Sequence, residues 1–216
     1  MGAVTVNERD AGSTDAQGRS GFRSHVLDSV AAYDEHLDAY THANAQAMEG
    51  EVGRFCELVR AAALPGPVLD AGCGPGRDLT RFAAAGVGSV GVDMSASFCR
   101  AAAMAAPVAR GDLCQLPFAD AAFAGVWACA SLVHLDERAA ATALVELARV
   151  AAVGAPVFVS VKSWSHPDGW VDTAHGRRWF RSWSPDELCR AMGESGFSVM
   201  STSRSGGFVD VWAQRG

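Results

Sequence analysis

The chain has 216 residues, of which 49% are hydrophobic, and it carries a formal net charge of -6. This composition excludes a disordered chain and predicts a globular protein with one sizeable core. The acidic balance argues against a nucleic-acid binder, which usually carries a basic face, and the chain lacks the run of about 18 apolar residues that would span a membrane.

Residues 1–20 are rich in Gly, Ser, Asp, Asn and Thr and show no hydrophobic periodicity, so we predict a disordered tail there. This stretch also lacks the apolar segment of a secretory signal. The six cysteines form no Cys-x-x-Cys pair and lie mostly among apolar residues. This favours reduced thiols, no zinc site and a cytoplasmic protein. We expect residues 21–216 to form a single domain.

Apolar side chains recur at three- and four-residue steps from Ser24 to Arg60, which predicts N-terminal helices within residues 21–63. One apolar face of the first helix would consist of Val26, Val30, Tyr33, Leu37 and Tyr40. A second helix is expected roughly over residues 44–63, because a Leu-Pro-Gly-Pro segment follows it and ends it.

Beyond Pro67, short apolar runs alternate with helical stretches, which is typical of strand-helix-strand units. The expected strands are residues 67–71, 89–92, 108–109, 124–128 and 156–161. The expected helices are residues 77–85, 96–106 and 136–151. Because these strands are apolar along their whole length, we expect helices on both faces of a mostly parallel sheet.

The C-terminal part departs from this alternation. Residues 163–178 are rich in Ser, Trp, Gly and His and are expected to form a loop. Ser184, Pro185 and Glu187 predict a helix start, as N-cap, first helical residue and capping-box partner. Residues 197–203 and 208–213 are expected to pair as an antiparallel hairpin. The chain is therefore predicted to form an α/β, Rossmann-like, doubly wound sheet of seven strands.

The segment VLDAGCGPGRD, residues 68–78, joins the first of these strands to a helix. Gly72, Gly74 and Gly76 alternate in it, and glycine permits both positive φ and close approach of a ligand to the backbone. The helix that follows offers free N–H groups and a partial positive charge to such a ligand. The same glycines are also compatible with a tight corner that binds nothing, so the turn alone leaves both interpretations open.

Acidic residues also follow the second and third strands, and parallel strands have their carboxyl ends at one edge of a sheet. Asp93 ends the second strand, where a carboxylate can bind the two hydroxyls of a ribose. Asp112 follows the third, where it can accept from an adenine amino group while Leu113 packs on the ring. Taken alone, each acid is also compatible with an ordinary surface or turn position. Asp93 is in addition compatible with the N-cap of the following helix, although Ser95 can fill that position instead. Acids at three successive strand ends favour a ligand site.

Four segments together resemble the class I S-adenosylmethionine-dependent methyltransferases, over roughly residues 68–203. They are VLDAGCGPGRD, GVDMS, GDLCQLPFADAAFAGVWACASLVHL and ELARVAAVGAPVFVSVK. The turn of that family reads Asp/Glu-x-Gly-x-Gly-x-Gly, which here is Asp70 followed by the three alternating glycines. One departure lies before the fifth strand, where the usual Gly-Gly turn is replaced by Val-Gly-Ala-Pro at residues 153–156.

This resemblance implies S-adenosylmethionine as the cofactor and S-adenosylhomocysteine as its product, with the glycine turn beside the methionine part. The residues it assigns to the cofactor are Asp70, Gly72, Gly74, Gly76, Arg77, Asp93, Met94, Asp112, Leu113, Ala130 and Tyr33. It also implies that the N-terminal helices of residues 21–63 cover the cofactor as a lid. No metal belongs to the predicted site.

Methyl transfer requires a general base only when the acceptor is protonated or is a poor nucleophile. His134, after the fourth strand, is the candidate base, and packing within its loop is the alternative. The candidate acceptor-binding residues are Tyr40, Trp164, Trp170, Trp179 and Arg178. The rings can stack on an acceptor or contact an amine, whereas any single Trp is as compatible with packing of the loop on the core. Arg178 lies in a His- and Arg-containing stretch that can bind an acidic group or remain solvated.

We expect a small-molecule acceptor, with neither nucleic acid nor membrane as a partner. In its high Ala and Gly content and in the segment VWACASLVHL, the chain is similar to actinobacterial small-molecule methyltransferases, including those of secondary metabolism. Two other classes stay open, an NAD-dependent oxidoreductase and a cofactor-binding subunit without activity, and a protein acceptor is a further variant. The usual oxidoreductase turn is Gly-x-Gly-x-x-Gly, which differs from the spacing here. The acceptor atom and the oligomeric state are not readable from the sequence.

Overall fold

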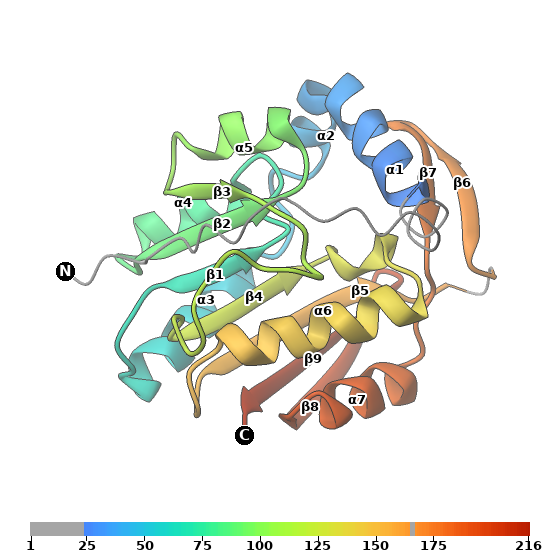
Figure 1. The fold of residues 1–216 in the computed structure, drawn as a ribbon. Helices are drawn as coiled ribbons and strands as arrows, with labels where there is room; N and C mark the ends of the chain where they lie inside the picture. The colour runs from blue at the N-terminus through green and yellow to red at the C-terminus, as the bar shows by residue number, and fades with distance from the viewer. Residues whose placement is uncertain (1–23, 165–166) are drawn as a thin grey trace, which may run out of the picture.

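A seven-stranded sheet forms the centre of the protein (Figure 1). Its strands, in spatial order, are β3 (Val108–Arg110), β2 (Ser89–Asp93), β1 (Val68–Ala71), β4 (Gly125–Cys129), β5 (Pro156–Lys162), β9 (Phe208–Arg215) and β8 (Phe197–Ser205). The first five are parallel, and β9 pairs antiparallel with both β5 and β8. The predicted mostly parallel sheet with a C-terminal hairpin is therefore confirmed.

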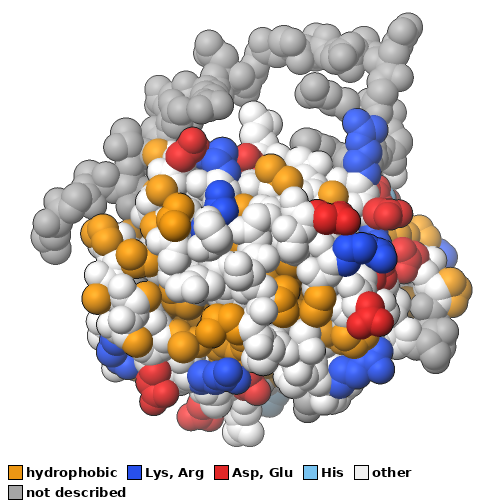
Figure 2. Space-filling view, turned by 90° about the horizontal axis from the view of Figure 1, so that it is seen from below, with side chains coloured by type: hydrophobic (Ala, Val, Ile, Leu, Met, Phe, Trp, Pro, Cys, Tyr) orange, Lys and Arg blue, Asp and Glu red, His pale blue; other side chains and the backbone are white. Residues whose placement is uncertain are grey.

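The computed structural model describes residues 24–164 and 167–216. The tail predicted for residues 1–20 lies outside the described residues. Among the described residues, none of the helices combines the length and hydrophobicity that a membrane span requires. On the face drawn in Figure 2, described acidic and basic side chains lie interspersed with hydrophobic ones, and neither charge forms a continuous field there.

Helices cover both faces of the sheet, as the uniformly apolar strands predict. On one face lie α3 (Glu49–Ala62), α4 (Arg77–Ala84) and α5 (Ala96–Ala102), and on the other lie α6 (Glu137–Val150) and α7 (Pro185–Glu194). Phe55 and Phe82 of the first group pack against Trp127 of β4. Leu144 and Leu188 of the second group belong to the larger buried cluster. Burial of this apolar area is the main favourable contribution to folding.

The N-terminal helices are shorter than their periodicity predicts. The first ends early, giving α1 (Ser24–Glu35) and α2 (Leu37–Ala43), and the second begins at Glu49 rather than near Asn44. The Asn44 side chain donates to the Tyr40 carbonyl oxygen at 2.8 Å, so it caps α2 instead of starting a helix. Met48 precedes α3 with φ 66°, a left-handed conformation that separates the two helices.

The segment predicted as a loop over residues 163–178 is in large part a hairpin. It consists of β6 (Gly169–Thr173) and β7 (Gly176–Phe180), which pair with each other alone. Gly176 has φ 85° at the turn, and the Thr173 hydroxyl accepts from the His175 N–H at 3.2 Å. The loop prediction was wrong because Trp, Arg and His residues obscure the two-residue alternation of a strand. The hairpin packs on α1, beside the carboxyl ends of the strands (Figure 1).

The start of α7 agrees with its sequence signals in part. The Ser184 hydroxyl accepts from the Glu187 N–H at 3.2 Å, and Pro185 is the first helical residue. The Glu187 carboxylate does not complete the predicted capping box, however, because it pairs with the Arg181 guanidinium. The competing ion pair is favoured because Arg181 is buried and requires a partner.

A buried carboxylate joins α4 to the centre of the sheet. Asp78, 4% exposed, accepts from two nitrogens of Arg77 at 2.8 and 2.6 Å and from Arg81 at 3.1 Å. It also accepts from the Trp127 indole N–H at 3.0 Å. Trp127 in turn stacks on Phe158 with ring centroids 4.2 Å apart. Asp78 therefore fixes the start of α4, directly after the glycine turn, against β4 and β5.

Replacing Asp78 by Asn should lower the free energy of unfolding by about 3–5 kcal/mol, because it leaves the partly buried Arg77 without a counter-charge. The matched control is Asp120→Asn, since Asp120 also pairs with an arginine but is 77% exposed. The control should lose less than about 1 kcal/mol. Urea denaturation followed by circular dichroism measures both. Equal losses would contradict the role given to Asp78.

Candidate active site

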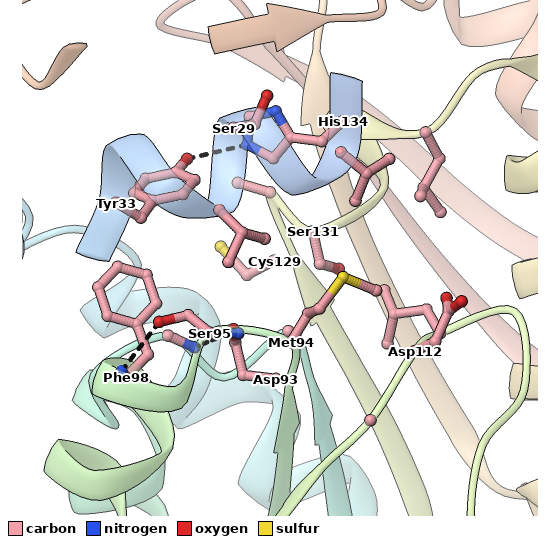
Figure 3. A pocket seen from close by; sticks show the side chains of 18 of the residues that line it. Ser29, Tyr33, Asp93, Met94, Ser95, Phe98, Asp112, Cys129, Ser131 and His134 are labelled. Carbon is pink, nitrogen blue, oxygen red and sulfur yellow. Dashed lines mark hydrogen bonds between the residues drawn. The ribbon is translucent and has the colours of Figure 1, made fainter. Parts of the chain in front are cut away.

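The carboxyl ends of four parallel strands meet along one cavity (Figure 3). The turn after β1, Asp93 of β2, Asp112 after β3 and Cys129 of β4 all line it. The predicted convergence of acids at one sheet edge is therefore observed for Asp93 and Asp112. A second cavity continues along the other side of the glycine turn, where Asp70 and Arg77 line it.

The glycine turn is left-handed at each of its three alternating positions. Gly72, Gly74 and Gly76 have φ of 76°, 53° and 92°. A Cβ on Gly72 would lie 2.3 Å from the Cβ of Ser131, and one on Gly76 would lie 2.8 Å from the Cα of Ala102. Side chains are thus excluded by both conformation and space. The turn backbone, with no side chain over it, lines both cavities.

Asp70, at the start of this turn, is buried at 2% exposure and has one carboxylate oxygen without a hydrogen-bond partner. Burial, and next the charge of Asp78, raise the pKa of Asp70 well above its ordinary value. A buried polar oxygen that lacks a partner is costly in a folded protein. Because Asp70 lines the second cavity, a ligand in that cavity can supply the missing partner.

Asp93 is held by backbone groups on both sides. One carboxylate oxygen accepts from the Gly74 N–H at 2.9 Å, and the other accepts from the Ser95 N–H at 2.9 Å. Ser95, rather than Asp93, caps α5, because its hydroxyl accepts from the Phe98 N–H at 3.0 Å. Each Asp93 oxygen keeps further acceptor capacity toward the cavity. Burial is the largest cause that raises the pKa of Asp93.

Helices α1 and α2 cover the cavity with aromatic side chains. Tyr33 of α1 and Tyr40 of α2 meet at 4.9 Å between ring centroids, and Tyr40 stacks at 5.5 Å on Phe98 of α5. Asp34 fastens α1 to the start of α5 by accepting from the hydroxyls of Ser95 and Ser97. The N-terminal helices thus lie over the strand ends, and their role as a lid over the cofactor stays a prediction.

His134, in the short 3₁₀ helix η1 (Leu132–His134), forms a two-sided hydrogen-bond chain. Its Nδ1 lies 2.7 Å from the Trp179 carbonyl oxygen. Its Nε2 lies 2.9 Å from the Tyr33 hydroxyl, a contact drawn in Figure 3. A carbonyl oxygen only accepts, so Nδ1 carries the proton and Nε2 accepts from Tyr33. Burial lowers the pKa of His134 from 6.5 to about 4, and Arg178 adds to that direction. The imidazole is therefore neutral near pH 7.

Comparison with known proteins relates part of the chain to methyltransferases. Residues 68–154, less than half of the chain, match the family model described as a methyltransferase domain. An O-methyltransferase, resE of Aspergillus sclerotiorum, is 36% identical over 103 residues, which are 43% of this chain and 38% of that protein. The chain thus matches well under half of the length of this curated relative.

Solved methyltransferases share the fold at low sequence identity. The 1,6-didemethyltoxoflavin-N1-methyltransferase of Burkholderia thailandensis is 20% identical, with a TM-score of 0.66 over 94% of this chain and 93% of its own. An amino pentose methyltransferase of Micromonospora echinaspora is 16% identical, with a TM-score of 0.67 over 83% and 96%. The cyclase SpnF is 20% identical, with a TM-score of 0.60 over 75% and 80%. The methyltransferase fold is therefore shared with a protein that is named for another reaction.

The fold brings all of the residues predicted for the cofactor to the two cavities. The residues lining one or both are Asp70, Gly72, Gly74, Gly76, Arg77, Asp93, Met94, Asp112, Leu113, Ala130, Tyr33, Tyr40 and His134. Arg77 is also tied to its surroundings, since it donates to the Asn44 carbonyl oxygen at 3.3 Å.

The predicted acceptor-binding residues from the Trp-rich segment are more scattered. Trp170 is 40% exposed on the hairpin surface, and the Arg177 guanidinium lies 5.6 Å from its ring centroid. Trp179 packs on His25 of α1 at 4.4 Å between centroids, and Trp164 meets Phe180 at 5.2 Å. Arg178 is buried against Tyr33. Of all the residues predicted to bind the acceptor, only Tyr40, which lies on α2 outside this segment, lines a cavity directly.

Several lining residues were missed by the sequence, among them Cys129, Ser131 and Phe98. Cys129 and Ser131 flank the end of β4, and applying the strand-end rule to a fourth strand would have found them. Phe98 lies inside α5 and carries no signal of its own. Among the described residues, no group of three or more His, Cys, Asp or Glu side chains is arranged to hold a metal ion.

The low pKa of His134 predicts a pH dependence of stability. Between about pH 6.5 and about 4, the unfolded chain binds a proton at this residue that the folded protein does not bind. The free energy of unfolding should therefore fall as the pH is lowered through this window. His134→Gln should remove that component, so the difference between the two proteins should narrow toward low pH. Urea titrations across the window measure it, and parallel profiles for both proteins would contradict the assignment.

Proposed function

We propose that this protein transfers a methyl group from S-adenosylmethionine to a small-molecule acceptor. The observation that carries the proposal is the turn of left-handed glycines between two cavities, with the unpartnered Asp70 oxygen on one side and the Asp93 and Asp112 carboxylates on the other. Such a cradle suits an elongated ligand with an ammonium at one end and a nucleoside at the other. The family match over residues 68–154 supports it.

The residues present fit this cofactor in charge and shape. Asp93 would hold the ribose hydroxyls with its remaining acceptor capacity, and Met94, Asp112 and Leu113 would surround the adenine. Asp70 would receive a partner from the amino acid end, because an ammonium both satisfies its orphan oxygen and favours its ionised form. The two solved relatives carry S-adenosylhomocysteine or S-adenosylmethionine.

When bound, the cofactor supplies an electrophilic methyl group on a sulfonium sulfur. The chain then has to align the acceptor with that methyl group and exclude water. Tyr33, Tyr40 and Phe98 form an aromatic cover that keeps water from the strand ends. An acceptor hydroxyl or amine that replaces the Tyr33 hydroxyl at Nε2 would deliver its proton to His134, which is neutral and ready to accept it.

A small acceptor agrees with a cavity that is covered by two helices and a hairpin. The two solved methyltransferases are named for 1,6-didemethyltoxoflavin and for an amino pentose, which are both small molecules. The second of these enzymes is described as involved in calicheamicin biosynthesis. We therefore include secondary metabolism in the proposal. The acidic chain favours neither nucleic acid nor an anionic membrane surface as a partner. Six free cysteines agree with a reducing, cytoplasmic location.

Binding of S-adenosylhomocysteine, measured by titration calorimetry, tests the cofactor assignment. Asp93→Asn should weaken it about 10- to 100-fold, because hydrogen bonds to a charged group contribute about 1.5–3 kcal/mol. Asp168→Asn is the matched control, since Asp168 is exposed and lies outside both cavities. NADH binding in place of S-adenosylhomocysteine would instead support the oxidoreductase.

Transfer itself is tested with S-adenosylmethionine labelled on its methyl group and separated pools of metabolites, RNA and proteins. Label in the metabolite pool that disappears with Asp93→Asn supports the proposal. Label in RNA or protein keeps the chemistry and overturns the acceptor class. Tight cofactor binding with no label in any pool contradicts methyl transfer and leaves a binding subunit or, as for the cyclase relative, another reaction.

His134→Gln tests the base once labelling has identified the acceptor. Turnover should fall about 10²- to 10⁴-fold, the usual contribution of general-base catalysis, while S-adenosylhomocysteine affinity stays the same. Tyr33→Phe is the companion variant. It should retain most of the turnover, since Tyr33 only occupies Nε2 until the acceptor arrives. Unchanged turnover in His134→Gln would leave positioning alone as the source of catalysis.

A further inference from the structure

Arg178 of β7 is a buried cation without a carboxylate partner among the described residues. It is 6% exposed, its Nη2 donates to the Thr173 hydroxyl at 2.8 Å, and its Nε has no partner. Its neighbours differ, because Arg177 pairs with Asp172 and Arg181 pairs with Glu187. A buried guanidinium is normally retained with a counter-charge, so an uncompensated one points to an anion that arrives from outside.

The aromatic rings around Arg178 compensate its charge only in part. The guanidinium carbon lies 4.5 Å from the ring centroid of Tyr33 and 5.2 Å from that of Phe180. Cation–π contacts of this kind orient a guanidinium over a ring face, and Arg178 also forms a side-chain hydrogen bond with Tyr33, but neither contact supplies a negative charge. The Nε donor therefore stays unmet within the described part of the chain.

A second cation lies close by, at the end of β5. The Lys162 ammonium is 3.8 Å from the ring centroid of Phe208 and 5.3 Å from that of Trp164. It, too, has no ion pair among the described residues. Burial lowers the pKa of Lys162, and the charge of Arg178 lowers it further. The two cations are also linked by ring contacts, because Arg178 lies over Phe180, Lys162 lies over Trp164, and these two rings meet at 5.2 Å between centroids. Two neighbouring cations favour an anion beside them.

Each cation lies against a ring that lines a cavity, although neither cation lines a cavity itself. Tyr33, under Arg178, lines the first cavity, and Phe208, under Lys162, lines the second. Arg178 also lowers the pKa of His134, so its charge acts at the candidate base. The carboxyl ends of β2 and β3, where Asp93 and Asp112 lie, belong to the opposite end of the first cavity. Arg178 therefore lies beside the Tyr33–His134 contact, where an acceptor would meet the candidate base, and Lys162 lies beside Phe208 of the second cavity.

We propose that Arg178 and Lys162 bind an anionic group of the methyl acceptor, a carboxylate or a phosphate, so that the substrate is an organic acid or a phosphate ester. This inference rests on the proposed function and names the substrate class of the same site. A guanidinium fork matches the oxygens of either group. The surrounding rings of Tyr33, Trp164, Phe180 and Phe208 add apolar contact for the body of an aromatic or otherwise planar acceptor.

The test uses three probes of similar shape on protein saturated with S-adenosylhomocysteine. Benzoate and phenyl phosphate carry the two anionic groups, and benzamide is the neutral match. By calorimetry or ligand-observed NMR, at least one anion should bind about 10-fold more tightly than benzamide, as expected for a charged hydrogen-bonded pair. Which anion binds better distinguishes a carboxylate from a phosphate acceptor. Equal binding of all three probes would overturn the proposal.

Arg178→Gln should abolish this preference, and Arg177→Gln, at an exposed position of the same strand, should keep it. Lys162→Gln is the second variant and should reduce the preference for the anion. It is chosen because Lys162 is only half-buried, so its replacement disturbs the core little. Without ligand, Arg178→Gln should unfold at a temperature no lower than Arg177→Gln, because it removes an uncompensated buried charge. The proposal would be overturned if Arg178→Gln unfolded at a clearly lower temperature than Arg177→Gln and Lys162→Gln kept the full preference for the anion. Arg178 would then have a structural role only.

The same samples separate this inference from the proposed function. Wild-type protein that fails to bind S-adenosylhomocysteine overturns the proposed function, and the substrate class falls with it. Normal S-adenosylhomocysteine binding without an anion preference overturns the substrate class alone. A loss of S-adenosylhomocysteine affinity in Arg178→Gln, as large as that in Asp93→Asn, would reassign the cation to the carboxylate of the cofactor and so overturn the acceptor assignment.

Discussion

The backbone of the turn between β1 and α4 touches two other segments so closely that a side chain has no room at two of its positions. A Cβ on Gly72 would meet Ser131 after β4, and one on Gly76 would meet α5. The turn also donates the Gly74 N–H to Asp93 of β2. Each of these contacts fixes one strand end relative to the others. The buried Asp78 carboxylate then holds α4 against Trp127, so the bare backbone of the turn stays open toward both cavities.

The cover of this site is held by hydrogen bonds as well as by ring contacts. Ser29, Tyr33 and Asp34, from one helix, reach β7, η1 and α5 in turn. Because each contact is a hydrogen bond near the cavity, binding of a ligand can exchange one partner for another without exposing the core. The chain Tyr33–His134–Trp179 is the clearest case, since its central imidazole is neutral and has a fixed tautomer. Helix α1 thus contacts the group that the proposed reaction would use.

Fold alone does not fix the reaction of this protein, because the cyclase SpnF shares the same architecture. The charges around the strand ends carry the functional argument instead. Acids follow β1, β2 and β3 along the two cavities, and Arg178 and Lys162, which lie against rings that line those cavities, have no acidic partner within the described part of the chain. The acids match a cofactor with a cationic ammonium, and the two cations match an acceptor with an anionic group. Cofactor binding and anion binding can therefore be measured separately.

The sequence by itself determined the parallel sheet, its helices, the left-handed glycine turn and the convergence of Asp93 and Asp112. The positive φ of glycine is a local property, and parallel pairing places the carboxyl ends of neighbouring strands at one edge of the sheet. It did not determine the β6–β7 hairpin, the short N-terminal helices or the environment of Arg178. Tyr33 and His134 meet across 101 residues of chain, and Arg178 reaches both only because the hairpin packs on α1. Such contacts depend on how whole elements dock. No periodicity within one segment encodes them, so only the tertiary structure decided which polar groups are left without a partner.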